Sequence, residues 1–158
     1  MIFVTVGLHN QGFDRLVREM DELAGQIKEE VIIQRGASAY LPRNARFFDY
    51  CSREESEQLF QKARLVVCQA GIGSIITALK YEKAFVVVPR LKKYKEHNSD
   101  HQLEVAREVG KRYGVPFTLE VKEIKGLLDS VKPVSKDNTG KGKIIQVVKE
   151  FIEEGVDE

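Results

Sequence analysis

Residues 65–88 place two apolar runs on either side of a glycine turn and a short helical segment, and they constrain the fold more than any other stretch. The runs are residues 65–68 (LVVC) and 85–88 (FVVV), whose β-branched content favours buried strands. Between them lie the turn QAGIGS (residues 69–74) and residues 75–81, which we expect to form a helix. A strand, a helix and a second strand within so few residues predict a βαβ unit with parallel strands.

The glycines of this turn suit it to holding an anion. Gly71 and Gly73 have no side chain, so a ligand can approach the backbone closely. The N–H groups at the start of a helix lack partners within it, and the helix dipole favours negative charge there. A phosphate or diphosphate is the natural anion for such a turn. The same glycines could instead serve only close packing of the helix on the strand, and the residues alone leave both interpretations open.

The rest of the chain repeats this alternation of strands and helices. Apolar runs predict strands, and apolar side chains at three- and four-residue steps predict helices. We expect further strands at 2–6, 31–33, 45–50 and 115–119, and helices at 13–27, 52–62, 100–113 and 121–131. The strands lack a two-residue period, which indicates an α/β fold: a doubly wound, Rossmann-like parallel sheet covered on both faces. Ligands bind such sheets at the carboxyl ends of the strands.

Local signals add detail to this layout. Ser52 with Glu55 three residues later predicts a capping box at the start of a helix. Pro116 suits an edge strand, because it has no N–H to donate to a neighbouring strand. We divide the chain into a ligand-binding α/β domain (1–131), a connector with proline, glycine and lysine (132–143), and a C-terminal helix and tail (144–158).

Charge and cysteine content exclude several partner classes. The 25 Lys and Arg residues nearly cancel the 24 Asp and Glu residues, so the net charge of +1 gives no reason to expect nucleic acid as a partner. No apolar run reaches the ~20 residues that span a bilayer, and the first residues lack the charged start of a signal peptide. The two cysteines, Cys51 and Cys68, form no CxxC motif, which favours a reducing, cytoplasmic setting.

Four motifs, taken in order, point to a known family. They are FVTVG (3–7) with FDRL (13–16), the glycine turn (71–74), VPRLKKY (88–94) and DHQL (100–103). With these the sequence resembles the glycosyltransferase family 28 C-terminal type, the UDP-sugar-binding C-terminal half of GT-B glycosyltransferases. It is most similar to short stand-alone chains: the soluble subunit of the two-chain N-acetylglucosaminyltransferase of lipid-linked oligosaccharide synthesis, and subunits of bacterial exopolysaccharide synthesis.

The resemblance implies a UDP-sugar site and assigns residues to its parts. The diphosphate would be held at the turn, the uracil would lie beside the end of the third strand, and the donor sugar would contact the start of the helix after the basic loop. These assignments correspond to Gly71, Ile72, Gly73 and Ser74; to Phe48; and to Asp100, His101 and Gln102. Gly7 would face the cleft between two domains, and Arg90 could neutralise phosphate charge.

Two departures from the family pattern bear on UDP binding, and Leu8 and Gly12 also replace the more usual threonine and proline of the first loop. Relatives usually carry a histidine where this chain has Gln69, and a glutamate that binds the ribose where it has Thr77. Thr77 can offer the ribose only a neutral contact. These departures favour a rival hypothesis, in which the chain is a non-catalytic scaffold or regulatory subunit that kept the fold and lost tight UDP binding.

The resemblance also implies an activity and a partner. The chain would be the donor-binding subunit of a heteromeric, inverting glycosyltransferase that moves a sugar, N-acetylglucosamine by default, from a UDP-sugar to a lipid-linked carbohydrate. It would need no cofactor. A membrane-anchored partner subunit would bind the acceptor and bring the chain to the cytoplasmic face of a membrane. A self-dimer that is active alone is the other enzyme hypothesis, and no residue stands out as the catalytic base.

Several other polar residues keep open roles. His97 and His101 are four residues apart, but no glutamate completes an HExxH motif, so we expect no metal site. His9 could face the cleft or be merely solvated. The basic run at 90–95 could be a solvated loop, or it could contact UDP, anionic lipid or the partner.

Overall fold

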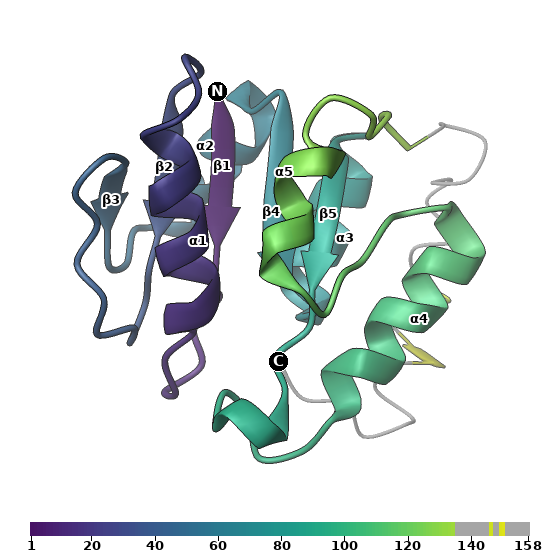
Figure 1. Cartoon of the computed structure of the whole chain (residues 1–158). Coiled ribbons are helices and arrows are strands. Elements are labelled where there is room, and N and C mark those ends of the chain that lie inside the picture. Colours follow the sequence, from purple (N-terminus) through teal and green to yellow (C-terminus); the bar gives the residue numbers. More distant parts are fainter. Residues whose placement is uncertain (135–145, 147–148, 151–158) are drawn as a thin grey trace.

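A five-stranded parallel sheet forms the centre of the protein, in a computed structural model that describes residues 1–134, 146 and 149–150. The strands are β1 (Ile2–Thr5), β2 (Val31–Gln34), β3 (Arg46–Phe48), β4 (Leu65–Gln69) and β5 (Ala84–Val88). They lie in the order β3-β2-β1-β4-β5, and each neighbouring pair is parallel. The chain begins at the centre, winds to one edge and then to the other (Figure 1). The predicted doubly wound sheet is confirmed.

Helices cover both faces of this sheet (Figure 1). They are α1 (Asp14–Ala24), α2 (Arg53–Lys62), α3 (Ile72–Lys80), α4 (His101–Tyr113) and α5 (Ile124–Leu127), with short 3₁₀ helices η1 (Lys92–Tyr94) and η2 (Val121–Glu123). Side chains of α1 and α5 pack in one apolar layer, and those of α2, α3 and α4 in the other. The sheet thus lies between two apolar helical layers, and its carboxyl edge is where a ligand would be expected to bind.

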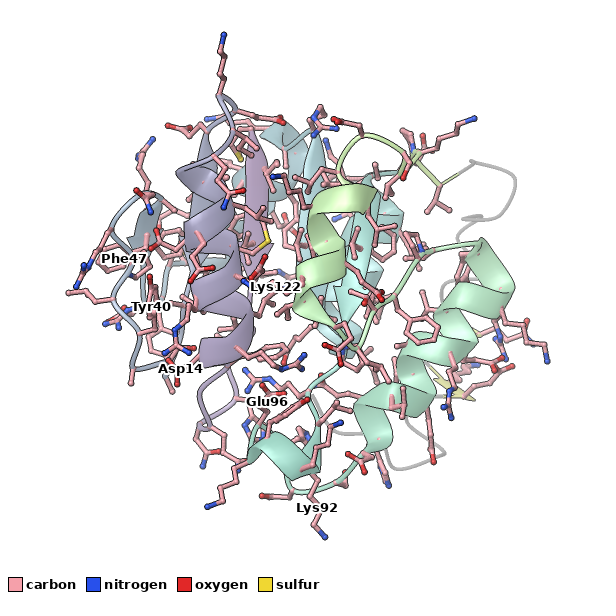
Figure 2. The ribbon with its side chains drawn as sticks, viewed as in Figure 1. Asp14, Tyr40, Phe47, Lys92, Glu96 and Lys122 are labelled. Carbon is pink, nitrogen blue, oxygen red and sulfur yellow. The ribbon has the colours of Figure 1, made fainter. Side chains whose placement is uncertain are left out.

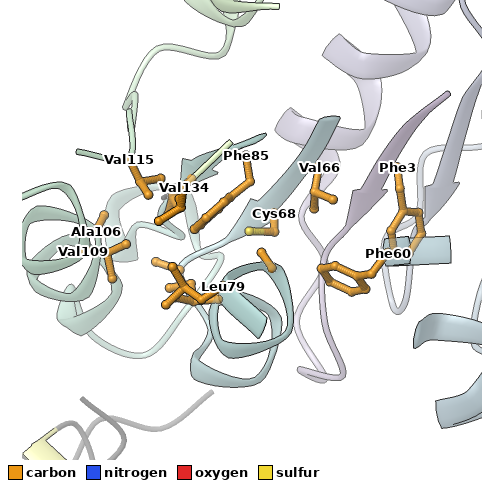
Figure 3. Close-up of a cluster of buried hydrophobic side chains, with 14 of the residues drawn as sticks. Phe3, Phe60, Val66, Cys68, Leu79, Phe85, Ala106, Val109, Val115 and Val134 are labelled. Atoms are coloured by element: carbon orange, nitrogen blue, oxygen red, sulfur yellow. The ribbon is translucent and has the colours of Figure 1, made fainter. Parts of the chain in front are cut away.

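Alternate residues of each strand enter opposite layers, which is why the strands are apolar throughout. In β4, Val66 and Cys68 join the layer of α2, α3 and α4, while its other apolar residues join that of α1 and α5. Figure 3 shows the first of these layers, in which the rings of Phe3 and Phe60 meet edge to face with centroids 5.3 Å apart. Burial raises the pKa of the Cys68 thiol to about 12, so this cysteine is an apolar core residue rather than a nucleophile.

The start of α3 differs from the expected helix of residues 75–81. The helix begins at Ile72, with Gly71 as its N-cap, so Gly73 and Ser74 lie inside its first turn. Small residues at these positions leave the first turn open to a neighbour. The capping box at Ser52 is confirmed: the Ser52 hydroxyl accepts from the Glu55 N–H, and the Glu55 carboxylate accepts from the Ser52 N–H.

The second half of the chain departs further from the prediction. The expected strand at 115–119 is wrong: the segment makes an isolated parallel bridge, between Phe117 and Val87. Pro116 has no N–H to extend that pairing. The expected helix at 121–131 is instead η2 followed by the single turn α5, which contains Gly126. The predicted connector (132–143) and C-terminal helix (144–158) fall almost entirely outside the described residues.

Acidic side chains of α1 fix the long loop between β2 and β3. Asp14 Oδ1 accepts from the Tyr40 N–H at 2.6 Å, and the two residues lie side by side in Figure 2. Asp21 is fully buried, and its carboxylate accepts from the Tyr40 hydroxyl and from three consecutive main-chain N–H groups, those of residues 43–45. One carboxylate therefore satisfies four donors of this loop.

Replacing Asp21 with asparagine is expected to lower the free energy of unfolding by about 3 kcal/mol at pH 7, because buried N–H groups lose a charged acceptor. Burial would raise the pKa of Asp21, but its hydrogen bonds outweigh burial and hold the pKa below the ordinary value of 3.8. The folded state therefore binds this proton less tightly than the unfolded state. The stabilisation is complete above that ordinary value and is lost as the pH falls through the lowered pKa.

Urea titrations of both proteins from pH 7 to pH 3 measure this effect. The difference in free energy of unfolding between wild type and Asp21→Asn should become smaller as the pH approaches 3. Glu22→Gln is the matched control, since Glu22 is exposed, lies next in the same helix and makes only a surface ion pair with Lys122; it should cost less than about 1 kcal/mol. Equal effects of the two substitutions would contradict the assigned role of Asp21.

Candidate functional site

A pocket of about 370 Å³ opens at the carboxyl edge of the sheet. Strands β1, β2 and β4 end at it with Thr5, Gln34 and Gln69, and the first two turns of α3 form one wall. The start of α2 and the segment before it form the opposite wall. The complete lining is Thr5, Gly7, Leu8, Gln34, Tyr50, Cys51, Ser52, Arg53, Ser56, Glu57, Phe60, Gln69, Gly73, Ser74 and Thr77.

The N-terminus of α3 gives this pocket a site for an anion. The N-cap residue, Gly71, has no side chain with which to cap the helix. The N–H groups of Ile72 and Ser74 belong to the first turn and have no acceptor within the helix. Gly73 and Ser74 line the pocket. A negatively charged group at this point would meet main-chain donors, the Ser74 hydroxyl and the positive end of the helix dipole.

Gln69 presents its amide nitrogen to the pocket in a fixed orientation. Its Oε1 accepts from Arg90 Nε and, at 3.2 Å, from Gln102 Nε2, so the amide oxygen points inward. Its Nε2 therefore points toward the pocket, and no described residue accepts a hydrogen bond from it. A neutral donor aimed beside the α3 N-terminus can bind an anion whatever the pH near neutrality.

Two glycines make room for the Gln69 amide. A Cβ on Gly7 would lie 1.8 Å from Gln69 Nε2, and a Cβ on Gly71 would lie 2.9 Å from it. Gly7 also has φ +77°, a conformation that other residues adopt only with strain. Gly7 is thus required on two counts, by its backbone and by the side chain that lies over it.

The loop after β1 is held by Gln34, which our sequence analysis did not select. Gln34 Oε1 accepts from the Thr5 hydroxyl and from the Val6 and Gly7 N–H groups, and Gln34 Nε2 donates to the Gly7 carbonyl at 3.1 Å. One buried amide side chain thus satisfies the polar backbone of this turn. The signal that could have identified it is a glutamine at the end of an otherwise apolar strand.

Arg90 does not line the pocket, although phosphate neutralisation was its expected role. Its side chain is 0% exposed, and its guanidinium donates to the main-chain carbonyls of Val6, Gln11, Gly12 and Glu96 as well as to Gln69. Burial lowers the pKa of Arg90 to about 10, so the group is still charged at neutral pH. Arg90 is an internal tie between the loop after β1, the loop after β5 and the end of β4.

The three residues expected near the donor sugar, Asp100, His101 and Gln102, lie outside the pocket lining and in different surroundings. Gln102 is fully buried beneath the pocket, where its Oε1 accepts from the Arg90 N–H. Asp100 precedes α4 and accepts from the Lys92 N–H, and His101 begins that helix. None of the three lines the pocket. Phe48 packs against the core layer shown in Figure 3 rather than lining the pocket, and Tyr50, two residues later, lies at the pocket with 54% of its surface exposed.

Thr77 lies in the pocket wall, but its hydroxyl is engaged. Thr77 Oγ1 donates to the Gly73 carbonyl, one turn earlier in α3, at 2.8 Å. This bond keeps the hydroxyl against its own helix. Thr77 can offer a ligand only the remaining lone pairs of a neutral oxygen.

The wall that α2 provides contains functional groups that our sequence analysis missed. Ser56 and Glu57 line the pocket from this helix, beside its N-cap Ser52, and Arg53 supplies a positive charge there with 87% of its side chain exposed. Ser56 and Glu57 belong to no recognisable motif, because only the packing of α2 beside α3 brings them to the glycine turn.

The basic loop after β5 is anchored from within by an acidic residue. Glu96 is buried, forms a two-point ion pair with Arg15 of α1 at 3.0 Å, and accepts from the Leu91 N–H. Figure 2 shows Glu96 beside the start of α1. Lys92 and Lys93 remain exposed on η1. The contacts of Glu96 therefore hold this loop in place, with Lys92 and Lys93 exposed to solvent.

Two histidines stack where the loops after β1 and β5 meet. The ring centroids of His9 and His97 are 4.8 Å apart. Burial lowers the pKa of His9, and the nearby charge of Arg90 and the ring of His97 lower it further.

Within residues 1–134, 146 and 149–150 no cluster of three or more metal-ligating side chains occurs. The described helices include none long and apolar enough to cross a bilayer.

Comparisons with known proteins extend this picture. The model of the glycosyltransferase family 28 C-terminal domain matches residues 1–153. No curated protein sequence matches the chain.

Solved glycosyltransferase structures share the fold at low sequence identity. SnogD from Streptomyces nogalater has a TM-score of 0.52 at 21% identity, over 96% of this chain and 39% of that chain. MurG from Acinetobacter baumannii has a TM-score of 0.56 at 17% identity, over 96% of this chain and 49% of that chain. VinC, solved in complex with dTDP, has a TM-score of 0.54 at 18% identity, over 96% of this chain and 37% of that chain. This chain therefore spans less than half of the length of each.

Proposed function

The chain belongs to the glycosyltransferase family 28 C-terminal domain family and has the fold of the C-terminal half of a GT-B glycosyltransferase, and on that premise we propose that it binds a sugar donor. In full, the proposal is the donor-binding subunit of a heteromeric glycosyltransferase that uses a UDP-sugar. N-acetylglucosamine is the first candidate for the sugar, before glucose and galactose. The acceptor is a lipid-linked carbohydrate. The UDP-sugar is itself the substrate, so the reaction asks for no separate cofactor.

One observation carries this proposal: the pocket sets the N-terminus of α3, whose N-cap is a glycine, beside the outward-pointing amide of Gln69. Gln69 and Ser74 line the same pocket, and in this proposal the Gln69 Nε2 and the Ser74 N–H donate to the same diphosphate. A diphosphate gains negative charge as the bond to the sugar breaks. Donors fixed in advance around it stabilise that charge and so favour departure of UDP.

The proposal assigns acceptor binding to a partner subunit, as in the two-chain enzyme that the sequence resembles. Each of the three glycosyltransferases compared is more than twice as long as the part that this chain matches. The partner would bind the acceptor, supply the catalytic base, carry the membrane anchor and hold the enzyme at the cytoplasmic face of a membrane. Leu8, at the pocket and 78% exposed, is a residue that such a partner could cover.

Isothermal titration with UDP, UDP-N-acetylglucosamine and UDP-glucose tests the donor site. We expect the wild-type chain to bind UDP, and the Gly73→Val variant to bind at least about a hundredfold more weakly, a change of about 2.7 kcal/mol. The branched side chain would occupy the first turn of α3, where the diphosphate should lie.

Gly126→Val is the matched control for this titration. A Cβ on Gly126 meets no atom within 4 Å, and this residue lies in α5, away from the pocket. The variant should bind UDP as the wild type does. Equal binding by wild type and Gly73→Val would exclude the α3 N-terminus as the phosphate site. Absence of UDP binding in the presence of an acceptor-binding subunit would count against the function itself.

The scaffold hypothesis has one observation in its favour. The Thr77 hydroxyl is turned onto the Gly73 carbonyl, so α3 offers no charged acceptor for a ribose. If the chain has lost nucleotide binding, UDP should fail to bind the wild type and should bind the Thr77→Glu variant. UDP binding by the wild type would remove the reason for this hypothesis.

A further inference from the structure

We propose that Glu57 of α2 accepts hydrogen bonds from the ribose hydroxyl groups of the bound nucleotide, so that the pocket selects ribonucleotides. The inference rests on the proposed function, because it assumes a nucleoside diphosphate in the pocket. It assigns a specificity-determining role to a residue that belongs to no sequence motif.

Glu57 lies on the wall of the pocket opposite the second turn of α3. Its carboxylate Oε1 is 3.6 Å from Nζ of Lys80, and Lys80 follows Thr77 by three residues, on the same side of that helix. With phosphates at the first turn of α3, the group bonded directly to them comes next along the wall. In a UDP-sugar the diphosphate is bonded to the ribose on one side and to the donor sugar on the other, and the proposal places the ribose on this side.

The Glu57 carboxylate has the acceptor capacity that a ribose needs. Its two ionic contacts, to Lys80 at 3.6 Å and to Arg53 at 3.8 Å, are longer than an ordinary hydrogen bond, so the carboxylate keeps lone pairs for a ligand. The side chain is 30% exposed, so a ligand can reach it. The two cations also offset repulsion between this carboxylate and a diphosphate.

Few other groups in the pocket could do the same. Among the described residues that line it, Glu57 alone carries a carboxylate. The Thr77 hydroxyl donates to the Gly73 carbonyl and offers only a neutral acceptor. Hydrogen bonds to an ionised acceptor are roughly twice as strong as neutral ones. Vicinal hydroxyls of a ribose would therefore find their best partner on α2.

Titration with UDP and with 2′,3′-dideoxy-UDP tests the proposal in the wild type and in Glu57→Gln. The wild type should prefer UDP by about tenfold or more, which is the effect expected of hydrogen bonds to a charged group. Glu57→Gln should reduce that preference to about twofold or less, mainly by lowering the affinity for UDP. The ratio of the two affinities is the readout, because a change of net charge near the diphosphate would affect both nucleotides alike.

Glu54→Gln provides the control, since Glu54 is exposed on the same helix and lies outside the pocket lining. It should leave the preference for UDP unchanged. A wild-type preference that survives in Glu57→Gln, or a wild type that binds both nucleotides equally, overturns the assignment while leaving the donor site in place. A wild type that binds neither nucleotide, alone and with an acceptor-binding subunit present, overturns both this inference and the proposed function.

Discussion

Replacing Arg90 with glutamine is expected to lower the free energy of unfolding by about 4 kcal/mol, the largest effect of any single substitution considered. The guanidinium donates to four main-chain carbonyls and to Gln69 in a site that water does not reach. Glutamine has two N–H donors and a shorter reach, so several buried carbonyls would lose their partner. UDP binding should fall as well, because the Gln69 amide would lose one of the two donors that orient it.

Urea denaturation monitored by circular dichroism gives the stability change, and Arg46→Gln is its control. The Arg46 side chain is 73% exposed and pairs with the exposed Glu30 at 3.2 Å, so its loss should cost less than about 1 kcal/mol. A cost below about 1 kcal/mol for Arg90→Gln would mean that water or another side chain can replace the guanidinium. The assigned role of Arg90 as an internal tie would then be wrong.

Replacing Gly7 with alanine is expected to lower the free energy of unfolding by about 3 kcal/mol and to weaken UDP binding at least about tenfold. The backbone at φ +77° becomes strained, and the new Cβ would lie 1.8 Å from Gln69 Nε2. The Gln69 side chain would have to move, and its hydrogen bonds to Arg90 and Gln102 would be disturbed. The substitution should therefore reduce both the free energy of unfolding and the affinity for UDP.

Gly114→Ala separates the two causes. Gly114 ends α4 with φ +69°, but a Cβ there meets no atom within 4 Å. This variant carries only the backbone strain, which should cost about 1 kcal/mol, and it should bind UDP normally. If Gly7→Ala costs no more than Gly114→Ala, the contact with Gln69 does not restrict position 7.

The features that the sequence predicts correctly here are local or repeated along the chain. The βαβ unit of residues 65–88 follows from apolar runs and one glycine turn, and the capping box at Ser52 from two residues three apart. The parallel sheet follows from strands that are apolar on both sides. The failure at 115–119 is also physical: Pro116 removes a donor, and the edge of β5 accepts only a brief pairing.

The site is harder to predict, because side-chain direction and burial decide it. Arg90 and Gln102 match family motifs, yet both lie beneath the pocket and act on Gln69. Glu57 matches no motif and lies in the pocket wall. A linear pattern locates residues at the correct edge of the sheet, but it does not distinguish a residue that would contact a ligand from one that supports such a residue.

The hydrogen bonds among Gln69, Arg90 and Gln102 also bear on how this protein can change over evolutionary time. The amide oxygen of Gln69 is the common acceptor of the other two side chains, all three buried. Loss of any one leaves buried polar groups unpaired, so the effects of substitutions at these positions are not additive. Lineages that descend from such a chain can alter the floor of the pocket only by concerted replacement, and positions 69, 90 and 102 should therefore covary.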